Sequence, residues 1–465
     1  MRAYFPFWFA FLFVAVIPLP SLGEDPALPL GLETSPQENS SEPALPAGIF
    51  SNEAPTEQSE ERKPWLDLSG FADFRAGVRT VSPVDEKQAS LGESRLQLQA
   101  DKRVSSHLIR LTTDFLYDPV RDEHDVDLET GQGVFDLREG FFQTSPLLPA
   151  QLKVGRQVLT WGLGDLIFIN DLFPKDWNSF FIGRDVEYLK APSDAAKFSY
   201  FLNNIGVDFV YTPRFDADRF IDGNRLSFYQ PAVGDIVGRS NAVQVTERDN
   251  WFTEDEFAAR LFGTIESYEL AAYFYSGYWK SPNGVDPLSG NGIFPRLNVY
   301  GASARGPLAS GLASLEVGYY DSRDDYQGDD PFVRNSEFRM IAGFEREIAS
   351  ELTASLQYYL EYTLDYGQYR STLPPTALDR DEDRQLLTLR LTQLLMQQNL
   401  TLSLFTFFSP TDEDAYFRPK IHYKWSDQWA GEVGGNVFLG KEKNTFWGQF
   451  HENTNIYAAV RYSFS

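Results

Sequence analysis

The sequence predicts an all-β protein that folds as one transmembrane antiparallel β-barrel of about 18 strands, within a range of roughly 16–18, with a loop folded into its interior. Three observations predict this fold. Apolar and polar residues alternate along stretches of about ten residues, the length that a tilted membrane strand needs. Short turns and long polar loops alternate between these stretches. Phe, Trp and Tyr make up 15% of the 465 residues, as in barrels with aromatic girdles.

The N-terminal region has two parts that we expect to lie outside the barrel. Residues 1–23 have the features of a secretory signal peptide, with Arg2, an apolar run that ends at Pro20, and a small residue at Gly23. Prolines within the apolar run argue against a membrane anchor. Residues 24–64 are rich in Pro, Glu, Ser and Ala and cannot bury enough apolar surface to fold. We expect a disordered acidic periplasmic leader, with binding of a periplasmic partner as an open alternative.

The barrel itself is expected over residues 65–465. Its first strand, 65–79, has Leu68, Phe74 and Val78 on one face and Asp73 and Arg75 on the other, as a strand between lipid and water requires. The same alternation predicts strands at 65–79, 93–102, 107–117, 135–144, 151–160, 194–202, 204–214, 256–266, 268–279, 296–305, 311–321, 336–347, 351–363, 385–396, 399–408, 415–425, 429–439 and 455–464.

The connectors support a membrane barrel over a soluble β-sandwich or propeller, which would also alternate. Short turns such as 202–204 and 397–399 alternate with long polar loops such as 215–255 and 366–384. Short periplasmic turns and long outer loops are typical of the outer membrane of Gram-negative bacteria, and an even strand count places both termini in the periplasm. No blade-length repeat supports a propeller.

The connector from Trp161 to Pro192 differs from the other long loops because it is rich in large apolar residues. Such a loop would be unfavourable in water, so we expect it to fold into the barrel. Its charged side chains would then line a constriction, where a low dielectric strengthens their field on a passing solute. The alternative is a loop that plugs the barrel or braces its wall. The expected constriction residues of this loop are Asp165, Asp171, Lys175, Asp176, Arg184, Asp185 and Glu187.

A short region around this loop resembles a known family. Gly155-Arg156-Gln157, Trp161-Gly162 and residues 170–174, with Arg184 and Pro192 beyond them, resemble an uncharacterised family of Gram-negative outer-membrane porin-like barrels of the porin superfamily. The triplet at 155–157 is also similar to a strand of alginate-export-type porins. The resemblance covers about 40 residues. It implies a passive or export channel, with the loop inside the barrel and Arg156 near the pore as a further constriction residue.

The water-facing sides of the strands predict a basic wall in the lumen. Its members are Arg75, Arg79, Arg95, Arg110, Arg418, Lys420, Lys424 and Arg461. Closure of the barrel places the last strand beside the first, so these groups would share one wall opposite an acidic loop. That arrangement would select anions. The alternative is that each arginine pairs with a carboxylate such as Asp73, Asp101, Asp114, Glu337 or Glu361 and stiffens the wall.

Other functions are disfavoured. The net charge is −25, of which −7 falls on residues 24–64 and −19 on residues 65–465, and this acidity argues against nucleic acid as a partner. The chain has no Cys, four scattered His and no catalytic fingerprint, so we expect no enzyme, cofactor or metal site.

We therefore predict a channel in outer-membrane lipid for the passive passage of small solutes, with selectivity for anions as a hypothesis. The alternatives are an export channel for an acidic, alginate-like polysaccharide and a non-conducting barrel that holds a periplasmic or surface partner. The oligomeric state is left open.

Overall fold

The computed structural model describes residues 65–465 except 122–125, 127–132, 148 and 376. In these residues one antiparallel sheet contains eighteen strands. The strands are β1 (Asp67–Arg79), β2 (Ala89–Val104), β3 (His107–Tyr117), β4 (Phe135–Leu147), β5 (Ala150–Val158), β6 (Pro192–Leu202), β7 (Ile205–Thr212), β10 (Glu256–Ile265), β11 (Tyr268–Tyr278), β14 (Arg296–Leu308), β15 (Gly311–Ser322), β16 (Glu337–Ala349), β17 (Leu352–Thr363), β18 (Asp383–Leu395), β19 (Leu400–Ser409), β20 (Asp414–Lys424), β21 (Trp429–Gly440) and β22 (Asn455–Phe464).

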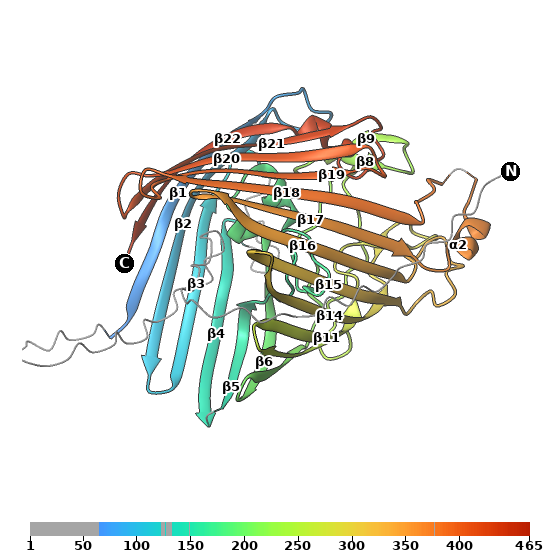
Figure 1. Ribbon diagram of the computed structural model, residues 1–465. Helices are drawn as coiled ribbons and strands as arrows, with labels where there is room; N and C mark the ends of the chain where they lie inside the picture. Colours follow the sequence, from blue (N-terminus) through green and yellow to red (C-terminus); the bar gives the residue numbers. More distant parts are fainter. Residues whose placement is uncertain (1–64, 122–125, 127–132, 148, 376) are drawn as a thin grey trace, which may run out of the picture. The chain divides into compact units, whose positions relative to one another are not determined.

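The sheet closes on itself (Figure 1). Each of these strands pairs with the next one along the chain, and β22 pairs with β1 in a register that runs from Gly70–Phe464 to Arg79–Asn455. Closure leaves no unpaired strand edge in the sheet, which satisfies the backbone groups of every strand. The predicted barrel of 18 strands is therefore confirmed, with strand limits that differ from the expected ones by at most four residues.

Alternation decides which face of each strand points inward. In β1 the side chains of Leu68, Phe74 and Val78 are exposed on the outer surface, whereas those of Asp73 and Arg75 are buried in the interior. This is the arrangement that the sequence of this strand predicts, because a membrane barrel presents apolar groups to lipid and polar groups to its lumen.

The connectors also divide between the two ends. Two-residue turns such as 105–106 and 203–204 join strands at one end, and long connectors such as 213–255 and 364–382 join them at the other. Helix α2 (Tyr366–Thr372) belongs to this long-connector end, and the C-terminus lies at the short-turn end (Figure 1). Since Asp67 begins β1 beside the turn after β2, both ends of the barrel segment lie at the short-turn end.

Smaller elements lie in the connectors. They are α1 (Trp177–Ile182), the 3-10 helices Val186–Leu189, Arg239–Asn241 and Gly448–Asn453, and the short strand pairs β8 (Phe228–Gln230) with β9 (Asp235–Val237) and β12 (Gly284–Val285) with β13 (Gly292–Ile293). Among the described residues, no helix is both long enough and apolar enough to cross a membrane.

The apolar core lies inside the barrel, where connector 159–191, here called the inward loop, packs against the wall. Phe181 of α1 makes edge-on ring contacts with Tyr416 of β20 and Phe438 of β21, at centroid distances of 5.5 and 5.3 Å. Trp161 also contacts Tyr273 of β11, with tilted rings and a centroid distance of 6.2 Å. The apolar residues that distinguish this loop in the sequence are therefore buried by folding inward, as expected.

Candidate functional site

The first half of the inward loop is fixed to the wall at β15, six strands away from β5 in the closed sheet. Glu316 of β15 accepts hydrogen bonds from the backbone N–H groups of Leu163 at 2.6 Å, Gly164 at 3.1 Å and Asn170 at 2.8 Å. A carboxylate that accepts several backbone hydrogen bonds acts as a rigid anchor, because these charge-assisted bonds are the strong ones. The loop thus leaves β5 and reaches β15, far around the barrel.

Asp165, one of the expected constriction residues, lies at the tip of this first half. Its carboxylate forms an ion pair with Arg390 of β18, and its backbone N–H donates to Gln357 Oε1 of β17 at 3.3 Å. Burial raises the pKa of Asp165 to about 6, and the nearby Arg390 and Arg418 cations oppose that rise.

Three other expected constriction residues are buried within the loop itself. Lys175 Nζ donates to Asp171 Oδ1 at 2.9 Å and to the carbonyl of Phe173 at 2.7 Å. Asp176 accepts from the backbone N–H of Ser179 at 2.7 Å and so caps helix α1. Asp171, Lys175 and Asp176 are each at most 4% exposed. Their charges therefore stabilise the fold of the loop and face little water.

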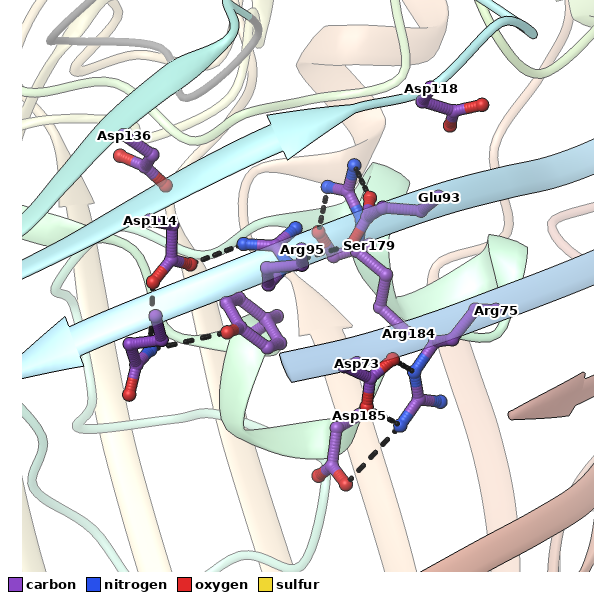
Figure 2. Close-up of polar contacts among 12 residues, drawn as sticks. Asp73, Arg75, Glu93, Arg95, Asp114, Asp118, Asp136, Ser179, Arg184 and Asp185 are labelled. Atoms are coloured by element: carbon purple, nitrogen blue, oxygen red, sulfur yellow. Dashed lines mark hydrogen bonds and ion pairs between the residues drawn. The ribbon is translucent and has the colours of Figure 1, made fainter. Parts of the chain in front are cut away.

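The second half of the loop returns to the wall formed by β1 and β2. Arg184 Nε donates to Glu93 Oε2 at 2.7 Å, and its Nη1 donates to Ser179 Oγ at 2.9 Å. Figure 2 shows Arg184 between these two acceptors, with Arg95 directed toward Asp114 alongside. Both partners of the Arg184–Glu93 pair are buried, so this contact holds the loop in a dry part of the interior.

Beyond Arg184 the loop carries its most accessible charges. Asp185 lies 3.8 Å from Arg75 and 3.9 Å from Arg461, and Glu187 accepts from Arg461 Nη2 at 3.0 Å. The exposed fractions of these side chains are 29% for Asp185, 45% for Glu187 and 23% for Arg461, against 5% for Arg75. Of the expected constriction residues, Asp185 and Glu187 are thus the ones that face the most water.

Arg156, which the family resemblance places near the pore, lies on β5 at the root of the loop. It is 7% exposed, and its Nε is 3.9 Å from Asp194 of β6. Its buried position is that of a group that supports the start of the loop.

The basic wall is mostly paired. Arg75 contacts Asp73 at 2.8 Å and Glu432 at 3.1 Å, and Arg110 contacts Asp101 at 2.6 Å. Further paired members are Arg95 with Glu93 and Asp114, Arg461 with Asp73, and Lys420 with Glu432. Arg79 instead donates to backbone carbonyls of Lys87, Ala89 and Arg225. Pairing with carboxylates, the alternative that the sequence left open, therefore describes most of this wall.

Two members of the basic wall differ from the others because they form no ion pair among the described residues. In the part of the chain that the structure describes, Arg418 and Lys424 have no carboxylate within ion-pair distance. The Arg418 guanidinium lies over the Phe180 ring, 4.0 Å from its centroid, and Lys424 is exposed near the short-turn end of β20. These two groups keep their positive charge uncompensated at close range.

A second segment also folds inward, which the sequence interpretation missed because it assigned 215–255 to an outer loop. Asp218 accepts from the backbone N–H of Lys175 at 2.8 Å, and Arg219 donates to Asp136 of β4 at 3.0 Å. Arg225 pairs with Asp118 after β3. The signal was present in the sequence as apolar residues within a polar loop, among them the buried Leu226.

The described residues contain no group of three or more His, Asp or Glu side chains placed to hold a metal ion.

No protein-family model matches the sequence, and a search of curated proteins finds no match. Among solved structures, OccD3 (OpdP) of Pseudomonas aeruginosa aligns over 86% of this chain and 91% of its own, with 7% identity and a TM-score of 0.51. OccAB3 of Acinetobacter baumannii aligns over 86% and 98%, with 10% identity and a TM-score of 0.50. The chain shares the closed barrel fold of outer-membrane porins. The resemblance to alginate-export-type porins stays a prediction.

Proposed function

We propose that this protein is an outer-membrane channel through which small solutes diffuse past the inward loop. The observation that carries the proposal is the path of that loop, which is anchored on β15 through Glu316 and on β2 through Arg184. Directly after the second anchor, Asp185 and Glu187 keep partly exposed carboxylates inside the barrel. Charges held on a rigid loop within a lumen are the elements from which a pore selects solutes by size and field.

The proposed membrane placement follows from the two faces and two ends of the barrel. The exposed apolar side chains on the outer surface fit lipid, and the short-turn end fits the periplasm. Both ends of the barrel segment would then be periplasmic. Residues 1–23 would act as a signal peptide and 24–64 as a leader, both outside the described residues. Binding of a periplasmic partner by the leader remains the open alternative for residues 24–64.

A preference for small anions is the second part of the proposal. Among the described residues, Arg418 and Lys424 have no carboxylate within ion-pair distance, and Lys420 and Arg461 are partly exposed. Asp185 and Glu187 oppose them from the loop. We infer that the uncompensated cations on β20 outweigh these two carboxylates, because both of the latter already share Arg461.

Planar-bilayer recording of the full mature chain tests the channel. A refolded sample whose barrel resists SDS at room temperature should give stepwise currents. In a KCl gradient the reversal potential should lie on the chloride side of zero. A silent barrel that is correctly folded would contradict the channel and favour the non-conducting barrel, and potassium-dominated current would contradict the anion preference. Block of the current by an acidic polymer such as alginate would direct attention to polymer export.

A further inference from the structure

Two lysines face one another across neighbouring strands in a part of the lumen that the predicted site does not include. In the register of β5 and β6, Lys153 lies directly opposite Lys197. Both side chains point inward, because the flanking Val154 and Phe198 are exposed on the outer surface. Like charges directly opposite in an antiparallel pair destabilise a sheet. The fold therefore tolerates an unfavourable pair at this position.

The surrounding charges do not neutralise the pair. Arg110 of β3 and Arg260 of β10 flank the lysines, so that four cations share the carboxylates Asp101, Glu139 and Asp208. Elsewhere in the interior the charges can balance: Arg334 and Arg339, for example, share Glu337 and Glu361. The lysine region thus carries an excess positive charge among the described residues.

The two available carboxylates are already engaged by other donors. Asp208 accepts from Arg260 Nη2 at 2.8 Å and from Ser199 Oγ at 2.6 Å, and it lies 3.5 Å from Lys197 Nζ. Glu139 accepts from Thr112 Oγ1 at 3.4 Å, and it lies 3.8 Å from Lys153 Nζ and 3.8 Å from Arg110. These lysine contacts are longer than the roughly 2.7–3.2 Å of a hydrogen bond. Each ammonium group therefore keeps donors for another acceptor.

Water reaches the pair from the lumen. The exposed fractions are 20% for the Lys153 side chain and 26% for that of Lys197, while Asp208 is 1% exposed. The Lys153 ammonium also lies over the Phe141 ring, 3.8 Å from its centroid, which fixes the side chain against the wall. Lys153 is close to the start of β5 at the short-turn end, whereas the inward loop begins after the other end of that strand.

We propose that Lys153 and Lys197 form an oxyanion-binding site, which takes the phosphate or carboxylate group of a small solute on the short-turn side of the inward loop. Binding rests on the lysine pair, whereas a role of the site in solute passage rests on the proposed channel. An oxyanion between the two ammonium groups would accept hydrogen bonds from both and offset their repulsion. The like-charge pair then has a reason to exist in a barrel where most of the other interior cations pair with carboxylates.

The first test measures binding without conduction. Inorganic phosphate is titrated against the full mature chain in detergent, and broadening of its phosphorus NMR signal reports the bound fraction. We expect saturable broadening for the wild type, a loss of at least ten-fold for Lys153→Gln/Lys197→Gln, and recovery for Lys153→Arg/Lys197→Arg. Lys441→Gln removes a 74% exposed lysine of a connector, outside the lumen site, and should keep the wild-type broadening. Equal broadening in the double glutamine variant, or an equal loss in Lys441→Gln, would overturn the site.

A stability measurement separates a ligand site from a structural one. Removal of both ammonium groups relieves their repulsion, so the glutamine variant should resist heat in SDS at least as well as the wild type. A variant that loses heat resistance together with phosphate binding would show that the lysines hold the wall, which would overturn the proposal.

A conductance measurement then separates this site from the proposed channel. In bilayers, added phosphate should reduce the chloride current of the wild type and have at least ten-fold less effect on the glutamine variant. Saturable phosphate binding by a barrel that never conducts would retain the site and contradict the channel. Conduction that phosphate leaves unchanged would retain the channel and overturn the role of the site in passage.

Discussion

Arg184 of the inward loop and Glu93 of β2 lie 91 positions apart in the sequence and meet as a buried ion pair, with Nε 2.7 Å from Oε2. Glu93 also accepts from Arg95 Nε at 2.7 Å, so one carboxylate joins the loop to two cations. Removal of one partner from a buried pair leaves an uncompensated charge and typically costs about 3–5 kcal/mol. This contact is therefore a principal restraint on the position of the loop.

The first prediction concerns this pair. Glu93→Gln should lower the temperature at which the barrel unfolds in SDS and increase current noise, because Arg184 and Arg95 lose their shared carboxylate. Glu413→Gln is the matched control, since Glu413 pairs with Lys441 on the exposed surface of a connector and its loss should leave both readouts unchanged. Quiet, wild-type currents from Glu93→Gln would show that the pair does not restrain the loop.

The second prediction concerns the end of α1. Gly183 has φ of +97°, and a Cβ there would lie 2.3 Å from Tyr457 Cδ1. Gly183→Ala should therefore shift the loop and destabilise the barrel by more than the roughly 1–2 kcal/mol that backbone strain alone costs. The loss is measured as reduced resistance to heat in SDS. Gly290→Ala controls for strain, because Gly290 also has positive φ but a Cβ there would meet nothing within 4 Å. Equal effects of the two variants would contradict tight packing against Tyr457.

The third prediction concerns pH. Burial raises the pKa of Asp165 to about 6, so the folded state disfavours its ionised form, and the contribution of this group to stability is lost as the pH rises through about 6. Lowering the pH from 7 to 5 neutralises Asp165 beside Arg390, Arg418 and Glu345 and makes the lumen more positive. The anion preference, measured as a reversal potential, should rise accordingly.

Variants isolate the Asp165 effect. Asp165→Asn should show the high anion preference at both pH values. Because His422 also lies in the interior, 3.8 Å from Glu432, the comparison is repeated in a His422→Gln background. A pH response that persists in Asp165→Asn/His422→Gln would assign it to another group.

The fourth prediction concerns Arg418. Its stacking on Phe180 is worth about 0.5–2 kcal/mol, and the described residues place no carboxylate within ion-pair distance of it. Arg418→Gln should thus reduce anion preference with a small change in heat resistance. Arg75→Gln should do the opposite, because Arg75 is buried between Asp73 and Glu432. A larger loss of anion preference in Arg75→Gln would contradict this division.

Strands and faces follow closely from sequence, whereas contacts between distant groups do not. The alternation of apolar and polar residues in β1 correctly predicts that Leu68 points outward and Arg75 inward. This signal is strong because a shift of one residue would move every side chain of the strand to the other face. The knowledge that a charged side chain points inward does not reveal which group it pairs with. Asp171 and Lys175 were expected to face a passage, yet they pair with each other at 2.9 Å because the loop folds over them.

The second inward segment shows a different limit. The criterion that identifies the inward loop, large apolar residues in a polar connector, also applies to Phe215 and Leu226, which are buried. The long run of Asp and Arg around them favoured an outer loop. Several of those charges are accommodated inside because they meet partners on the wall or the loop, as Arg219 meets Asp136. Such ion pairs join two distant segments of the chain, and sequence patterns do not predict which segments will lie side by side.

Single-channel recording of the wild-type mature chain tests the central claim most directly. A barrel that is folded and SDS-resistant should give discrete current steps that reverse on the chloride side of zero in a KCl gradient. Glu93→Gln, measured in parallel, should conduct with more noise as the loop loses its anchor at Arg184. A folded wild-type barrel that gives no current at any voltage, while Glu93→Gln is equally silent, would contradict a channel narrowed by residues 159–191.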